Sequence, residues 1–269
     1  MVWREWCPPD APASATVVLF HGGAGAWTHW YRNIESLSQR YRVLAPDLPG
    51  LGESDHVCEP YTVQDAVAPT AAALSELCSV HEPLHLLAFS WGCSVASGVA
   101  REISRSSRRA NLRSMLLIGP AGLGEVPRGA MTPLLRRVAA MSRTDELALH
   151  RENLARLMVY DRAKIDDQAV ELQFINANRA RFFSPGFARQ TAVRDALVHT
   201  QAPLKVIYGA HDAPVAPHFD ARETVLRNAR ADLEFEVIPG VGHWLPFEWP
   251  DFNSYAHAWM EQHNVMATR

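Results

Sequence analysis

The segment Leu84-His85-Leu86-Leu87-Ala88-Phe89-Ser90-Trp91-Gly92 decides the fold. Six mostly apolar residues lead to a serine, and a stretch rich in small residues follows it. An apolar run of this length is typical of a strand buried on both faces of a parallel sheet. A serine directly after such a strand can stand on a sharp turn that lifts its hydroxyl above the sheet, if the residues two positions before and after it are small. Gly92 meets this requirement, whereas Ala88 stands where glycine is usual.

The same serine has a second interpretation, because serine is a preferred N-cap residue of helices. Taken alone, the turn around Ser90 fits that structural role better than a catalytic one. The choice between the two therefore depends on which residues the rest of the chain places at neighbouring strand ends.

Five further apolar runs predict strands, at residues 16–20, 42–46, 114–118, 204–208 and 233–238. The stretches between them have helical character, at residues 28–39, 62–79, 91–105, 217–229 and 249–263. This alternation predicts an α/β fold with a doubly wound, mostly parallel sheet. The last run alternates polar and apolar residues, which predicts an edge strand.

Residues 121–200 interrupt the alternation. They predict helices at 131–141, 144–158 and 166–180 and no strand. Such a long insertion exceeds an ordinary connection in a compact domain. We therefore predict a helical cap over 121–200, inserted into a core formed by residues 1–120 and 201–269. The alternative is that this stretch simply continues the fold.

Two further residues give the serine a catalytic context. Asp212 follows the predicted strand 204–208, and His243 follows 233–238 between a glycine and a tryptophan. A histidine at a strand end can take the proton of Ser90, and an aspartate behind it can orient the imidazole. We therefore predict that Ser90, Asp212 and His243 form a catalytic triad.

Each of these residues also has a plainer interpretation. Asp212 could be only a turn residue, because aspartate is favoured in turns. His211 could be the base, although it would then leave Asp212 without a role. The loop at 119–124 contains no carboxylate, which favours Asp212 as the acid.

A glycine-rich loop, His21-Gly22-Gly23-Ala24-Gly25, follows the first predicted strand. Attack on a carbonyl creates an oxyanion, which needs N–H donors fixed in advance. We predict that the backbone N–H groups of Trp91 and Gly23 form this oxyanion hole, with Ala24 as the neighbouring candidate. The alternative, a phosphate-binding loop, lacks the lysine and the glycine spacing of such motifs.

The substrate pocket is predicted from residues near the triad and in the cap: Ala24, Phe89, Met158, Phe174 and Trp244. For Met158 and Phe174, ordinary core packing is an equal alternative. The chemistry of a serine triad requires neither a metal nor an organic cofactor.

Composition sets further limits. The chain has 269 residues, 26 basic and 29 acidic side chains, and a net charge of −3, which does not favour a nucleic-acid partner.

The four cysteines, at positions 7, 58, 78 and 93, lack metal-ligand or disulfide spacing, which predicts free thiols in a reducing cytoplasm. No secretory leader and no membrane-spanning run is expected. We expect a cytoplasmic protein with a small-molecule substrate, and the sequence leaves a homodimer open.

The motifs above, in this order, resemble the α/β-hydrolase superfamily over nearly the whole chain. The chain order Ser90, Asp212, His243 is the order of that superfamily. A closer resemblance is to the meta-cleavage-product hydrolases, which cleave C–C bonds in vinylogous 1,5-diketones. It rests on segments 21–25, 30–34, 118–124 and 242–244.

The resemblance implies hydrolysis, but the sequence departs from this closer group at two positions. Those enzymes have an asparagine before the nucleophile, where this chain has Phe89, and a cap arginine where this chain has Gln173. Arg179 or Arg181 could substitute for that arginine. Because Phe89 favours a less polar substrate, we predict a serine hydrolase that cleaves carboxylic esters through an acyl-enzyme. The alternatives are C–C hydrolysis, a cofactor-free oxygenase or haloperoxidase-like activity, and a non-catalytic, receptor-like ligand-binding protein.

Overall fold

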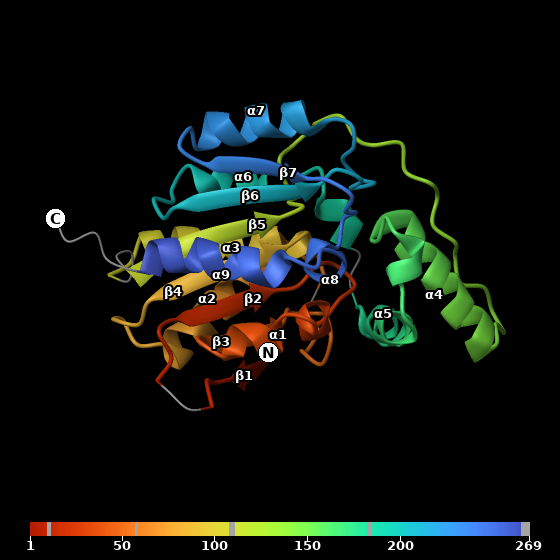
Figure 1. Ribbon diagram of the computed structural model, residues 1–269, viewed down its shortest axis with the longest axis horizontal. Helices are drawn as coiled ribbons and strands as arrows, with labels where there is room; N and C mark the ends of the chain where they lie inside the picture. The colour runs from red at the N-terminus through yellow and green to blue at the C-terminus, as the bar shows by residue number, and fades with distance from the viewer. Residues whose placement is uncertain (10–11, 57–58, 108–110, 182–183, 265–269) are drawn as a thin grey trace.

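The computed structural model describes residues 1–9, 12–56, 59–107, 111–181 and 184–264. A seven-stranded sheet in the order β1-β3-β2-β4-β5-β6-β7 runs through the core (Figure 1). The strands are β1 (Val2–Trp6), β2 (Thr16–Phe20), β3 (Arg42–Asp47), β4 (Leu84–Phe89), β5 (Leu112–Ile118), β6 (Leu204–Gly209) and β7 (Glu234–Ile238). All neighbours pair in parallel except β1, which is antiparallel to β3.

The six predicted strands are confirmed, and so is the edge position of β7. Strand β1 was not predicted from the sequence. It is an edge strand in which two charged residues, Arg4 and Glu5, separate Trp3 from Trp6, and all five residues keep some exposure. A partly solvated antiparallel edge does not need the continuous apolar run of a central strand, so it left no comparable signal.

Helices cover both faces of the sheet. On one face lie α2 (Val63–Leu77), α3 (Trp91–Ser104), α6 (Ala192–Leu197) and α7 (Phe219–Ala229), and on the other α1 (Ile34–Ser38) and α9 (Phe252–Asn264) (Figure 1). Strand β4 shows how the two faces arise: Leu86 and Ala88 belong to one buried apolar cluster, whereas Leu87 and Phe89 belong to the other. Successive side chains of a strand point to opposite faces.

Two helices, α4 (Arg143–Leu157) and α5 (Asp167–Arg179), lie beyond the carboxyl ends of the strands (Figure 1). They confirm the helices predicted near 144–158 and 166–180. Below, the cap means these two helices and the residues between them. Within the range predicted for the cap, α6 instead packs on α3 of the core. Its Val193 and Leu197 share an apolar cluster with Val95 of α3.

The helix predicted over 131–141 is wrong, because these residues form no regular secondary structure. The N–H of Leu135 donates to Asn153 Oδ1 at 2.8 Å, and the Nδ2 of Asn153 donates to the Leu135 carbonyl at 3.0 Å. Arg156 donates to the carbonyl of Pro133 at 2.6 Å. Side chains of α4 thus satisfy backbone groups that a helix would have bonded internally.

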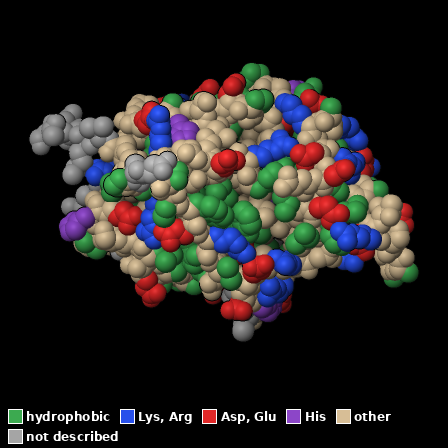
Figure 2. Space-filling model, turned by 60° about the horizontal axis from the view of Figure 1, so that its bottom comes forward, with side chains coloured by type: hydrophobic (Ala, Val, Ile, Leu, Met, Phe, Trp, Pro, Cys, Tyr) green, Lys and Arg blue, Asp and Glu red, His purple; other side chains and the backbone are tan. Residues whose placement is uncertain are grey.

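No helix among the described residues is both long enough and apolar enough to cross a membrane. Lysine, arginine, aspartate and glutamate side chains are interspersed over the face that Figure 2 presents. Cys7 and Cys93 are free thiols, Cys78 is buried, and Cys58 lies outside the described residues.

The turn after β4 has the strained backbone that the sequence predicted. Ser90 has φ 52° and ψ −114°, a conformation that costs free energy for a residue with a side chain. A Cβ at Gly92 would lie 2.6 Å from the carbonyl oxygens of Phe20 and His21. Helix α3 can therefore approach β2 only if residue 92 is glycine. Ala88 is fully buried within β4, where the sheet accommodates its methyl group.

Gly92→Ala is expected to lower the free energy of unfolding by about 1–3 kcal/mol or more, because the new methyl group would collide with backbone rather than with a movable side chain. Urea denaturation of both proteins measures the difference. The matched control is Ser97→Ala on the same helix, since the buried Ser97 hydroxyl has no hydrogen-bond partner among the described residues. That control should leave stability unchanged or slightly raised. Equal stabilities of Gly92→Ala and Ser97→Ala would contradict this account.

Candidate active site

Three side chains meet above the carboxyl ends of the sheet. The Nε2 of His243 lies 3.0 Å from Ser90 Oγ, and its Nδ1 lies 2.7 Å from Asp212 Oδ2. Asp212 is fully buried and His243 is 6% exposed. The structure thus brings together the three residues of the predicted triad, each from a loop that follows a different strand. Their distances suit transfer of a proton from serine to imidazole.

Tight backbone contacts hold the acid and the base in register. Asp212 begins a turn in which its carbonyl accepts from the N–H groups of Val215 at 2.9 Å and Ala216 at 2.8 Å. A Cβ at Gly209 would lie 2.1 Å from the carbonyl oxygen of Gly242, so the two loops touch through their backbones. The competing base, His211, stacks on the ring of Tyr160 with 3.5 Å between centroids.

The two predicted oxyanion donors flank the nucleophile. Trp91 is the first residue of α3, and the helix dipole favours negative charge at this end of the helix. Gly23 and Ala24 line the same cavity as Ser90. Ala24 has φ 47°, so the glycine-rich loop turns sharply at this point.

His29 supports that loop and was not predicted from the sequence. It is 2% exposed, and its Nδ1 accepts from the N–H of Gly22 at 3.1 Å. The ring packs edge-on against Phe89 and tilted against Trp244, with centroids 5.5 and 5.1 Å away. Burial holds the pKa of His29 well below its ordinary value, and the neighbouring His21 and His243 lower it further. A histidine next to a glycine-rich loop carries no sequence signal that separates a buried support from a surface residue.

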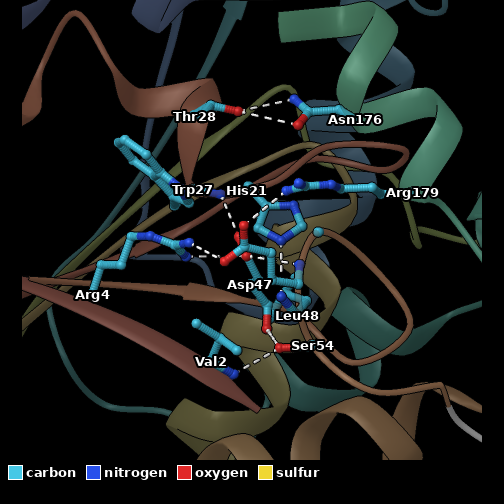
Figure 3. Close-up of polar contacts among 12 residues, drawn as sticks. Val2, Arg4, His21, Trp27, Thr28, Asp47, Leu48, Ser54, Asn176 and Arg179 are labelled. Atoms are coloured by element: carbon cyan, nitrogen blue, oxygen red, sulfur yellow. Dashed lines mark hydrogen bonds and ion pairs between the residues drawn. The ribbon is translucent and has the colours of Figure 1, made fainter.

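Hydrogen bonds hold the segment that begins at the end of β3. The Asp47 carboxylate accepts from the N–H groups of Trp27 at 2.9 Å and Glu53 at 3.0 Å, and it pairs with Arg4 at 3.1 Å (Figure 3). His21 Nε2 accepts from the N–H of Leu48 at 2.9 Å. These bonds join the segment after β3 to residues on both sides of the glycine-rich loop, and none of them involves Ser90.

A cavity of about 490 Å³ opens above Ser90 between the core and the cap. Ala24, Phe89 and Met158 line it, as predicted. Phe174 and Trp244 do not line it, which corrects two predicted pocket residues. Phe174 packs against His150 and Arg143 within the cap, and Trp244 lies behind the wall, stacked on Phe247 at 4.5 Å.

The cap arginines weighed as substitutes do not line the cavity. Arg179 pairs with Glu53 at 2.9 Å (Figure 3), and Arg181 donates to the carbonyl of Gly52. Gln173 does line the cavity. The cavity is also lined by three arginines that the sequence did not single out: Arg128, Arg189 and Arg222. No Asp or Glu is among the described lining residues.

Comparison with known proteins identifies the family of this chain. The model of the alpha/beta hydrolase family matches residues 17–253. The chain belongs to the alpha/beta hydrolase family. This match covers the strand ends that carry Ser90, Asp212 and His243, and it confirms the predicted fold class.

Relatives of this family member include two hydrolases of oxo-dienoate compounds. The chain is 26% identical to a 2-hydroxy-6-oxononadienedioate/2-hydroxy-6-oxononatrienedioate hydrolase of Comamonas testosteroni, over 90% of this chain and 86% of the relative. It is 25% identical, with the same coverage, to a 2-hydroxy-6-oxo-6-phenylhexa-2,4-dienoate hydrolase of Burkholderia cepacia.

Solved structures with the same fold include a meta-cleavage product hydrolase and an esterase. A meta-cleavage product hydrolase from Pseudomonas fluorescens superposes with a TM-score of 0.72 and 21% identity, covering 97% of this chain and 93% of the other. An esterase from a Rhodococcus species superposes with a TM-score of 0.73 and 18% identity, covering 97% and 94%. At these identities the likeness shows the fold alone.

The buried state of His29 predicts a pH dependence of stability. Its folded pKa lies below the ordinary value of 6.5, so the unfolded chain takes up a proton that the folded protein excludes. The contribution of His29 is therefore complete above about pH 6.5 and is lost as the pH falls below it. His29→Phe should reduce the slope of unfolding free energy against pH, by up to about 1.4 kcal/mol per pH unit for one proton.

Urea denaturation between pH 8 and pH 5 measures this slope. His81→Asn provides the control, because His81 is exposed on a loop, and it should keep the wild-type slope. An unchanged slope in His29→Phe would show that His29 takes up its proton equally in the folded and the unfolded protein, which would contradict this account.

Proposed function

We propose that this protein is a serine hydrolase that cleaves carboxylic esters through an acyl-enzyme. One observation carries the proposal: the hydrogen-bonded line from Ser90 through His243 to Asp212 opens into a cavity that is lined mostly by apolar residues and glycines. Such a cavity accepts the acyl or alcohol part of a small ester, and the serine hydroxyl stands at its floor.

The proposed reaction follows from the positions of these groups. His243 Nε2 takes the Ser90 proton as Oγ attacks the ester carbonyl, and Asp212 stabilises the imidazolium. The N–H groups of Trp91 and Gly23 bind the oxyanion. The intermediate collapses, and His243 protonates the leaving alkoxide. His243 then activates a water molecule, which releases the acid and returns the proton to Ser90.

The residue before the nucleophile supports an ester rather than a polar dienol substrate. Phe89 is fully buried and packs between His29 and His243, with centroids 5.5 and 5.0 Å away. The Phe89 side chain itself offers no hydrogen-bond donor next to Ser90. The arginines at the cavity, with no acidic lining residue among those described, favour neutral or anionic esters over cationic ones.

C–C hydrolysis is the second candidate, and the names of the relatives favour it. Both relatives described above are called hydrolases of 2-hydroxy-6-oxo-dienoate compounds. The same nucleophile, base and oxyanion donors would serve that reaction. The two candidates differ in what the cavity must bind beside Ser90.

Ser90→Ala is expected to lower the hydrolysis of p-nitrophenyl esters by at least about 1,000-fold, and Asp212→Asn by a similar factor, because the nucleophile or the orientation of its base is lost. Release of p-nitrophenolate from esters of rising acyl length measures kcat/KM. Ser97→Ala serves as the control and should keep the wild-type rate. Wild-type protein that turned over none of the esters, yet bound them, would favour the receptor-like alternative. Equal rates for wild type and Ser90→Ala would exclude the triad mechanism.

Phe89→Asn separates the two hydrolytic candidates. The wild type should cleave the best ester with a kcat/KM at least about 10-fold above that for 2-hydroxy-6-oxo-6-phenylhexa-2,4-dienoate, whose colour loss reports cleavage. Asparagine at position 89 should lower the ratio of kcat/KM for the ester to kcat/KM for the dienoate, because it adds a polar group that can bind the dienol. Faster cleavage of the dienoate than of any ester by the wild type would make C–C hydrolysis the activity.

A further inference from the structure

The Glu248 carboxylate is buried directly behind the loop that carries the base. It ends the short helix α8 (Leu245–Glu248) and is 2% exposed. Three backbone N–H groups donate to it: Gly242 at 2.7 Å and Tyr160 at 3.0 Å to Oε2, and Asp161 at 2.7 Å to Oε1. Hydrogen bonds to a charged acceptor are stronger than neutral ones, so these three bonds are a substantial attachment.

The donors come from two parts of the chain that are far apart in sequence. Gly242 immediately precedes His243. Tyr160 and Asp161 belong to the cap, in the connection between α4 and the 3-10 helix η3 (Arg162–Lys164). One carboxylate therefore joins the loop of the base to the cap.

The two backbones also touch directly. The N–H of Trp244 donates to the carbonyl of Met158 at 2.7 Å. A Cβ at Gly242 would lie 2.8 Å from Tyr160 N and 2.9 Å from the Met158 carbonyl oxygen, so only glycine permits this approach. Met158 lines the cavity. The residues on either side of His243 are thus bound to a cap segment that forms part of the cavity wall.

A second attachment of the cap, at α5, is of a different kind. On α5, Asn176 Nδ2 donates to Thr28 Oγ1 at 2.9 Å, and Arg179 pairs with Glu53 (Figure 3). Both partners of the Arg179 pair are more than 40% exposed, and such pairs contribute little to stability. Beside His243 the cap is therefore held through backbone groups, whereas these two contacts of α5 use side chains.

We propose that Glu248 is a positioning residue, which holds His243 and the cap wall at Met158 in one fixed arrangement. It touches neither Ser90 nor the cavity, and it acts through the backbone of Gly242, Tyr160 and Asp161. This inference rests on the proposed ester hydrolysis by Ser90 and His243. Loss of the carboxylate displaces the base and the wall together, so it changes both the chemical step and the choice of acyl chain.

The test compares Glu248→Gln, Glu248→Asp and Asn176→Ala with the wild type on p-nitrophenyl esters of rising acyl length. Glutamine keeps the size but turns an NH₂ group toward a backbone N–H. It should lower kcat about 10-fold or more on the best ester and shift the preferred acyl length. Aspartate keeps the charge and should recover part of kcat. Asn176→Ala, which loosens the other end of the cap, should mainly raise KM.

Wild-type kcat and acyl preference in Glu248→Gln would overturn the proposal, and so would equal kcat values for the glutamine and aspartate variants. If Glu248→Gln does not fold, amide hydrogen exchange of the wild type decides. The amides of Tyr160, Asp161 and Gly242 should then be protected to the same extent, as groups that open together, and exchange at three unrelated rates would overturn it. A wild type without esterase activity contradicts the proposed function instead, and the exchange measurement remains valid in that case.

Discussion

Parallel pairing brings the site together, because all six parallel strands, β2 to β7, end at the same edge of the sheet. Hydrogen bonds continue across that edge beyond the last residues of the strands. Three backbone N–H groups donate to carbonyl oxygens of the neighbouring strand: Ser90 to Ile118 at 2.9 Å, Gly119 to Ile207 at 2.8 Å, and Ala210 to Ile238 at 2.8 Å. Each strand end is thereby fixed against the next. Loops that leave such an aligned edge can place a nucleophile, an acid and a base within hydrogen-bond reach.

That alignment requires very close backbone contacts. Gly92 lies against the carbonyl oxygens that end β2, and Gly209 lies against the loop of the base. Ser90 itself takes up a strained backbone conformation. The surrounding residues must keep Ser90 in this strained conformation. The fully buried side chains of β4 and α3 provide that packing.

Aromatic packing behind the nucleophile gives the site its particular character. His29, Phe89 and Trp244 form a closed group in which the indole N–H of Trp244 donates to the His29 carbonyl at 2.9 Å. The group supports the oxyanion loop through Gly22 and one face of His243 through Phe89. A polar side chain before Ser90 would have to find partners inside this group. The apolar wall and the support of the loops are therefore two consequences of the same packing.

The sequence by itself determined the fold class, six of the seven strands, and the approach of Ser90, Asp212 and His243, because buried parallel strands leave continuous apolar runs and each of these residues follows one. It did not determine strand β1, the irregular course of residues 131–141, or the cavity lining, where Phe174 and Trp244 proved to be packed elsewhere. Nor did it mark Glu248, which follows an apolar stretch as an ordinary acidic residue would. Its partners lie 6, 87 and 88 positions away in the chain. Only the tertiary structure decides which distant backbone groups a side chain meets, because that depends on how the cap is laid against the core and not on local pattern.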